Sequence, residues 1–117
     1  GLAMVNPFFI RCVEMKEKDI IYHAIGEIDK LCQKIINKEN YMIDMPACIQ
    51  AINQACEIIL KYNNHSEEII PILEDVMYGM TQRDEVFLLD VLRYGMKDKL
   101  EQIYDGLGIN EAENAYE

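Results

Sequence analysis

The chain has 117 residues, of which 50% are hydrophobic and 27% are charged, and its formal net charge is −10. These values fit a single folded domain, since one core typically spans roughly 100–150 residues, and they exclude a disordered chain. No stretch approaches the roughly 20 consecutive apolar residues of a membrane-spanning helix, so we expect a soluble, cytoplasmic protein.

Residues 1–18 are expected to form an N-terminal arm. Its first three residues precede Met4 and are interpreted as a vector remnant. Asn6 and Pro7 disfavour a helix, and β-prone residues follow them. This pattern leaves three possibilities open: an irregular arm, a short strand or a helical extension.

Two apolar stripes at helical spacing come next. The first predicts a helix from Asp19 to Asn37, and Gly26 within it suggests a close approach by another helix. The second follows Asp44 and Pro46, which resemble a capped helix start because proline is tolerated in the first turn. This helix is predicted to end near Tyr62.

Two further helices are predicted in the second half. The third starts at Ser66, with an acidic first turn, or at Pro71; the earlier start requires the helix to absorb a proline. The fourth is capped by Thr81 or Asp84 and ends near Asp105, before two glycines.

The four stripes together predict an all-α fold. Links of roughly 4 to 10 residues favour antiparallel neighbours, so residues 19–106 should form an antiparallel up-down helical bundle of three to four helices. Residues 107–117 are acidic and have few apolar side chains, and we expect a mobile tail there.

Charge is unevenly distributed along the chain. Residues 1–66 carry eight acidic and seven basic side chains, whereas residues 67–117 carry thirteen acidic and four basic ones. Nucleic-acid affinity depends largely on Lys and Arg neutralising phosphates, so we expect neither nucleic acid nor an anionic membrane surface as partner. A cationic or amphipathic protein segment is the better candidate.

Few residues suggest catalysis or metal binding. The four cysteines contain no Cys-x-x-Cys pair, which favours buried, reduced thiols over a disulfide framework or a zinc site. His23 and Glu27, spaced i, i+4, could meet on one helix face, and His65 is expected in a loop beside a helix cap. We therefore expect no catalytic residue, no metal and no cofactor.

Three methionines and one aspartate are the candidate binding residues of the second half. Met77, Met80 and Met96 suit an adaptable apolar groove, although core filling is the alternative for each. Asp90 lies within an apolar run. It is interpreted as an exposed partner of Arg93 or Tyr94, as an inter-helix anchor, or, least favoured, as a catalytic carboxylate.

The segment of residues 84–102, DEVFLLDVLRYGMKDKLEQ, resembles the final helix of a group of small bacterial helical proteins, some linked to motility genes. Asp90 and Tyr94 match an aspartate and a tyrosine of that group, while Arg93 or Gly95 stands where its members have an acidic residue. Helix order and loop lengths also resemble, more faintly, the flagellin export chaperones. The resemblance implies no enzymatic activity, and it implies Asp90 and Tyr94 as structural anchors.

Three functions are compatible with these patterns. The favoured hypothesis is a non-enzymatic protein-binding module, chaperone-like or adaptor-like and linked to motility. Its partner is a protein or peptide that presents an amphipathic helix. The first alternative is a small ligand-binding or enzymatic bundle. The second is a structural oligomerisation domain, such as a homodimer in which Phe8 and Phe9 of the arm pack on a second copy.

Overall fold

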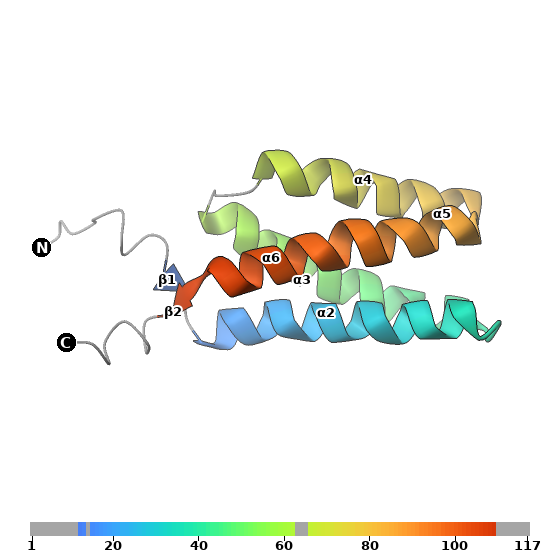
Figure 1. The fold of residues 1–117 in the computed structure, drawn as a ribbon, viewed down its shortest axis with the longest axis horizontal. Coiled ribbons are helices and arrows are strands. Elements are labelled where there is room, and N and C mark those ends of the chain that lie inside the picture. Colours follow the sequence, from blue (N-terminus) through green and yellow to red (C-terminus); the bar gives the residue numbers. More distant parts are fainter. Residues whose placement is uncertain (1–11, 14, 63–65, 110–117) are drawn as a thin grey trace, which may run out of the picture.

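The structure is a computed structural model that describes residues 12–13, 15–62 and 66–109. The expectations for residues 1–11, for His65 and for residues 110–117 therefore lie outside the described residues. The four long helical segments form an antiparallel up-down bundle, which confirms the predicted all-α fold (Figure 1).

The helices occupy most of the described chain. Their bounds are α2 Met15–Ile36, α3 Met45–Tyr62, α4 Ser66–Gln82, α5 Glu85–Asp90, the π-helical segment η2 Val91–Lys97 and α6 Asp98–Gly106. A 3-10 turn, η1, spans Tyr41–Ile43 before α3. The last three helical segments follow one another without a break and form a single rod, which is the fourth helix of the bundle.

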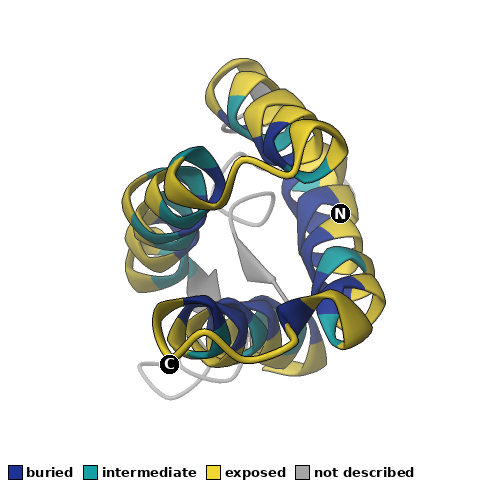
Figure 2. Cartoon of the chain, turned by 90° about the vertical axis from the view of Figure 1, so that its right-hand side faces the viewer, coloured by how far each residue is buried: buried dark blue, intermediate teal, exposed yellow. Residues whose placement is uncertain are grey.

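The core lies along the axis of the bundle, because each helix carries its apolar stripe on one face. Figure 2 shows the buried residues on the inward faces of the helices and the exposed residues on the outward faces. The most deeply buried large side chains come from all four helices: Ile21, Ile28, Leu31, Ile52, Ile69, Val76, Leu88, Leu92, Met96 and Leu100.

The π-helical segment keeps the stripe of the fourth helix facing the core. Leu88, Leu92, Met96 and Leu100 are buried and are spaced by four residues. In a regular α-helix such a stripe would turn by about 40° at each step. The i→i+5 bonds of a π-helix place more residues in each turn, so the four side chains stay on one face. The predicted stripe began at Leu89, which is only half-buried; Leu88 takes that place.

Two turns end their helices in the same way. Lys38 and Arg83 have left-handed backbones, with φ of 62° and 53°. In the first turn the Glu39 amide donates to the Lys34 carbonyl and the Lys38 amide to the Ile35 carbonyl. The second turn repeats this bonding, which is the pattern of a Schellman motif.

The fourth helix begins after Asp84, one of the two predicted caps. Its carboxylate accepts a hydrogen bond of 3.1 Å from the Phe87 amide. The third helix begins at Ser66, the earlier of the two predicted starts, and contains Pro71.

The close helix approach predicted at Gly26 is wrong. No atom lies within 4 Å of the position that a Cβ would occupy there. The close approach occurs at Gly79 of α4, where a Cβ would lie 3.2 Å from Phe87 Cδ2 and 3.3 Å from Leu88 Cα. Gly95 similarly faces Ile72.

The first and last described elements meet at one end of the bundle. Strand β1, Cys12–Val13, pairs in parallel with β2, Gly108–Ile109. Lys18 of α2 donates to the Leu107 carbonyl at 3.4 Å, and its Nζ lies 4.5 Å from the centre of the Tyr104 ring.

Two described segments differ from the expected bounds of the elements. The first helix starts at Met15 rather than at Asp19. Gly108 and Ile109, placed in the mobile tail by the sequence, form the paired strand β2.

Candidate binding groove

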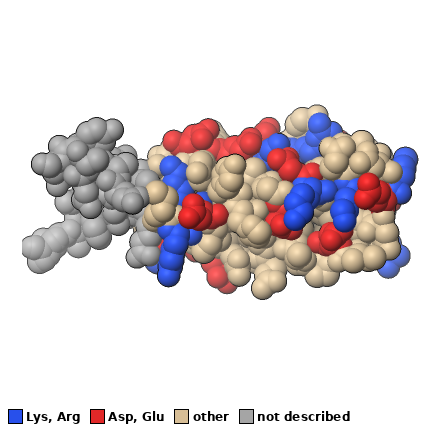
Figure 3. All heavy atoms as spheres, turned by 90° about the horizontal axis from the view of Figure 1, so that it is seen from below, with Lys and Arg blue, Asp and Glu red and all other residues tan. Residues whose placement is uncertain are grey.

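The outward face of α3 is unusually poor in charge for this acidic chain. Residues 45–56 contain no charged side chain, although 27% of the whole chain is charged. Gln50, Asn53 and Gln54 are exposed on this face. Figure 3 shows a broad area without charged side chains on the side of the molecule formed by α2 and α3. Such a surface can bury amides and apolar groups without desolvating an ion.

An open hollow of about 720 Å³ lies against this face. Five of its nine lining residues are apolar, three are amides and one, Glu57, is acidic. The lining consists of Met42, Met45, Pro46, Ile49, Gln50, Asn53, Gln54, Glu57 and Met80. An apolar lining with a few polar groups is typical of a binding site, in which the apolar part gives contact area and the polar part gives orientation.

Helix α4 contributes the opposite wall through an apolar stripe. Ile70, Leu73, Met77 and Met80 follow one another at spacings of three, four and three residues, so they share one face of α4. Ile70 is 42% exposed and Met77 is 44% exposed, while Leu73 and Met80 are half-buried. Because Met80 lines the hollow, this stripe faces the groove between α3 and α4.

The packing between α3 and α4 leaves this groove open. Among neighbouring long helices, α3 and α4 make the sparsest contacts, whereas α2 packs extensively on α3. Leu60, one turn beyond Cys56 on α3, is 42% exposed. We define the α3/α4 groove as the hollow together with Leu60 and the four-residue stripe of α4.

The electrostatic surroundings of the groove are acidic. Helix α4 carries four acidic and no basic side chains, Glu67, Glu68, Glu74 and Asp75. Glu68 is paired with Lys99 of α6 at 2.8 Å, so it belongs to the opposite flank of α4. Glu74 is spaced i+4 from Ile70 and i−3 from Met77, which places it beside the groove.

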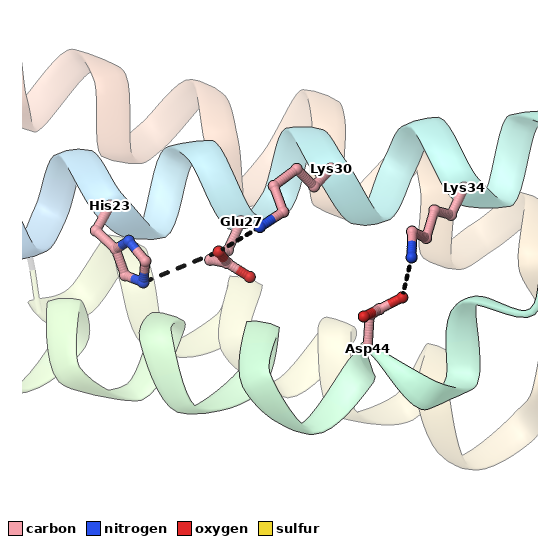
Figure 4. A network of polar contacts seen from close by, with 5 residues as sticks. All are labelled: His23, Glu27, Lys30, Lys34 and Asp44. Atoms are coloured by element: carbon pink, nitrogen blue, oxygen red, sulfur yellow. Dashed lines mark hydrogen bonds and ion pairs between the residues drawn. The ribbon is translucent and has the colours of Figure 1, made fainter.

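A second, smaller hollow of about 280 Å³ lies on the other flank of α3. It shares Gln50 and Gln54 with the groove and is otherwise lined by His23, Glu27, Ala47 and Ala51. His23 Nε2 lies 3.9 Å from Glu27 Oε2, and Lys30 Nζ lies 3.0 Å from the same oxygen (Figure 4). The pairing of His23 with Glu27 considered from their spacing is therefore present, and Lys30 neutralises the carboxylate.

A further ion pair in Figure 4 joins Lys34 of α2 to Asp44 before α3. The hydrogen bond that Lys34 donates to the Asp44 carboxylate raises the pKa of Lys34 above its usual value. This pair fixes the turn that leads into α3, and thereby the end of the groove that Met42 and Met45 line.

The structure separates the three candidate methionines. Met80 lines the groove and Met77 lies exposed on the same stripe. Met96 is wrongly placed by the groove prediction: it is 0% exposed, because the four-residue spacing of the π-helical segment directs it into the core. Core filling, the alternative given for each methionine, is correct for Met96.

Asp90 and Tyr94 lie away from the groove, on the rod formed by α5, η2 and α6. Asp90 is exposed, as its favoured interpretation required. Tyr94 is 64% exposed, and the Arg93 guanidinium lies 5.3 Å from its ring centre. Neither residue is buried as an inter-helix anchor would be, so the anchor role implied by the resemblance is wrong. Asp90 lines neither hollow and does not meet His23.

Sequence reasoning missed one buried carboxylate. Glu17 of α2 is 8% exposed and receives hydrogen bonds from Lys61 Nζ at 2.9 Å and Tyr62 Oη at 2.6 Å. These bonds compensate for burying the charge, which is otherwise costly. They tie the first turn of α2 to the last turn of α3.

Three cysteines are free and buried between the helices, as predicted from their apolar character: Cys32, Cys48 and Cys56. Burial raises the pKa of Cys48 from 9.0 to about 12 and that of Cys56 to about 11. The same cause raises the pKa of Cys32 to about 11. A thiol with a raised pKa is a poor nucleophile, so these residues fill the core.

The described part of the chain contains neither a metal-binding cluster nor a membrane-spanning helix. Within residues 12–13, 15–62 and 66–109, no group of three or more His, Cys, Asp or Glu could hold a metal ion. No helix in the same residues is both long enough and apolar enough to cross a membrane.

Comparison of the chain with protein-family models, with curated proteins and with solved structures gave no match.

Proposed function

We propose that this chain is a non-enzymatic protein-binding module that holds an amphipathic helix of its partner in the α3/α4 groove. The observation that carries the proposal is the half-exposed apolar stripe of α4, which faces the mainly apolar and amide-lined hollow of α3. An amphipathic helix binds such a groove by burying apolar side chains at spacings of three and four residues.

The groove suits a helix better than a small substrate. It is open along its length and is bordered by side chains of two antiparallel helices, so a rod-shaped partner can pack on both. Methionine has a flexible, polarisable side chain that adapts to different apolar partners, which fits the presence of four methionines in and beside the hollow: Met42, Met45, Met77 and Met80.

The ligand-binding or enzymatic alternative has less support. A single enclosed pocket shared by Asp90 and His23 would favour it, and neither hollow is lined by both residues. The chaperone-like role, the link to motility and the cytoplasmic location belong to the favoured proposal. They rest on the resemblance of residues 84–102 and on composition.

The experiment measures fluorescence anisotropy of a labelled amphipathic Leu/Lys peptide, with a scrambled peptide of equal composition as reference. Met80→Asp should weaken binding about tenfold, because roughly 1.4 kcal/mol of apolar contact and carboxylate desolvation is lost. Met77→Asp should act in the same direction. Tyr94→Asp is the matched control, since it places the same charge on an exposed side chain outside the groove.

Three results would refute the proposal. One is equal binding of the scrambled peptide. Another is weaker binding by Tyr94→Asp than by Met80→Asp, because the contact would then lie on the fourth helix. The third is binding that is lost at moderate salt and is unaffected by either methionine, which would indicate a purely electrostatic contact.

A further inference from the structure

The chemistry of the α3/α4 groove specifies its occupant further, on the premise of the function proposed above. Glu57 is the sole charged residue among the nine that line the hollow. Its side chain is exposed, and no ion pair joins it to another residue in the described part of the chain. Lys61, one turn further along α3, is paired with Glu17 at 2.9 Å. The carboxylate of Glu57 is therefore accessible to a cationic group of a partner that fills the groove.

The apolar part of the hollow and this carboxylate lie at a defined separation. Met45, Ile49 and Met80 line the apolar end, and Glu57 follows Ile49 by eight residues on the same helix. At a rise of 1.5 Å per residue, this separation is about 12 Å along α3. A helix lying along the groove has the same rise, so its matching groups stand about eight residues apart.

Helix periodicity limits the number of residues that can separate the apolar anchor of the partner from its basic residue. Residues seven apart lie on nearly the same face, and residues eight apart are offset toward one flank. Both positions allow a long basic side chain to reach a carboxylate at the groove while the anchor stays buried. A position four residues from the anchor lies about 6 Å short of the carboxylate, and a position eleven residues from it lies about 4.5 Å beyond.

We propose that the occupant is an amphipathic helix with a large apolar anchor between Met45, Ile49 and Met80, and with a Lys or Arg seven or eight residues from that anchor, opposite Glu57. Glu74 of α4, which lies beside the groove, adds to this selection, because its carboxylate repels an acidic helix and attracts a basic one. The surrounding amides of α3 accept polar, uncharged neighbours.

The test uses 18-residue alanine- and glutamine-based helical peptides that carry one leucine pair as anchor and one lysine. The lysine stands four, seven, eight or eleven residues from the anchor, in both chain orders, so that composition and net charge stay constant. Binding to the full chain is measured by NMR chemical-shift titration, which also reports whether the groove residues are the ones perturbed.

Lysine at seven or eight residues should bind about threefold to fivefold tighter than lysine at four or eleven, as expected for a partly exposed ion pair. Glu57→Gln should abolish this preference while keeping the binding of the anchor. Asp90→Asn is the matched control, because it removes one negative charge from an exposed site on α5 and should leave the preference unchanged.

The inference is overturned if affinity does not depend on lysine spacing, or if the dependence persists in Glu57→Gln. If either result is found and Met80→Asp still weakens binding, the proposed Lys or Arg opposite Glu57 is rejected. The proposed helix-binding function is then retained. Failure of every peptide to bind would reject both. Circular dichroism of Glu57→Gln, an exposed and nearly isosteric change, verifies that folding is retained.

Discussion

Replacing two glycines by alanine should change stability in opposite directions, although both lie inside helices. Gly26 of α2 has open space where a Cβ would be added. Alanine there should stabilise the protein by about 0.5–1 kcal/mol, because it restricts the unfolded backbone and favours the helix.

Alanine at position 79 of α4 has the same advantage in helix propensity, but its Cβ would pack too closely against α5. Its added Cβ would lie 3.2 Å from Phe87 Cδ2 and 3.3 Å from both Cα and Cβ of Leu88. The Leu88 backbone cannot move aside easily, since α5 is capped by Asp84 and Leu88 is 1% exposed. Overpacking of this kind costs typically 1–3 kcal/mol, so the net loss should be about 1 kcal/mol.

Urea unfolding followed by circular dichroism measures both variants. The two free energies of unfolding should differ by about 2 kcal/mol, and at slopes of roughly 1–3 kcal/mol per molar urea the midpoints should separate by about 1 M. If Gly79→Ala stabilised the protein as much as Gly26→Ala, the close approach of α4 and α5 would be refuted. Equal slopes for both variants are the control for an unchanged unfolding reaction.

Four further predictions concern single positions. Met96→Ala should lower the free energy of unfolding by about 2–5 kcal/mol and Met80→Ala by under about 1 kcal/mol, as measured by urea unfolding; equal losses would contradict their different burial. Asp84→Ala should cost about 1 kcal/mol through loss of the helix cap, whereas an unchanged midpoint would show that the cap bond is not needed. Lys38→Gly should raise the melting temperature by about 4 °C, because glycine adopts φ of 62° without strain, and a lower melting temperature would argue against a left-handed turn. The free energy of unfolding should fall as pH rises above 9.0, because burial raises the pKa of Cys48 to about 12 and the thiol of the unfolded chain loses its proton first. Cys48→Ala should show a smaller fall between pH 8 and 10. An equal fall in the variant would contradict the raised pKa of Cys48.

Helix positions could be predicted well where periodicity and capping agree. The second helix was predicted from the residues after Asp44 to Tyr62 and is observed as Met45–Tyr62. The start at Ser66 could be proposed from its acidic first turn, but the choice against Pro71 needed the backbone. Local sequence determines these features because caps and stripes act within one or two turns.

The π-helical segment could not be predicted in this way. The sequence contains leucines at both 88 and 89, and a period of 3.6 residues favours Leu89 with Leu92 and Met96. Only packing against α2 and α4 shows that Leu88 is the core residue and that the period is longer. If the number of residues per turn is assumed wrongly, each side chain is assigned to a helix face that is wrong by a fraction of a turn.

The groove was partly predictable, since methionines on the third helix indicated it. Met80 and Met96 are the same residue type at similar positions in apolar stripes, yet one lines the groove and the other is fully buried. Their difference depends on which helices are neighbours and on how closely they pack. The same limit applies to Glu17, whose partners lie 44 and 45 residues away in sequence.

The pairing of β1 with β2 and the hydrogen bond from Lys18 to Leu107 form a junction that joins the first and last described elements at one end of the bundle. Lys18 and the Leu107 carbonyl are 89 positions apart, whereas successive helices are separated by only a few residues in the sequence. Closing so large a loop carries an entropy cost that local helix pairing avoids, so this junction should form late in folding. Once it has formed, the first turn of α2 and the last turn of α6 hold each other. Their amide protons should then exchange with solvent through one shared opening, rather than by independent fraying of two helix ends.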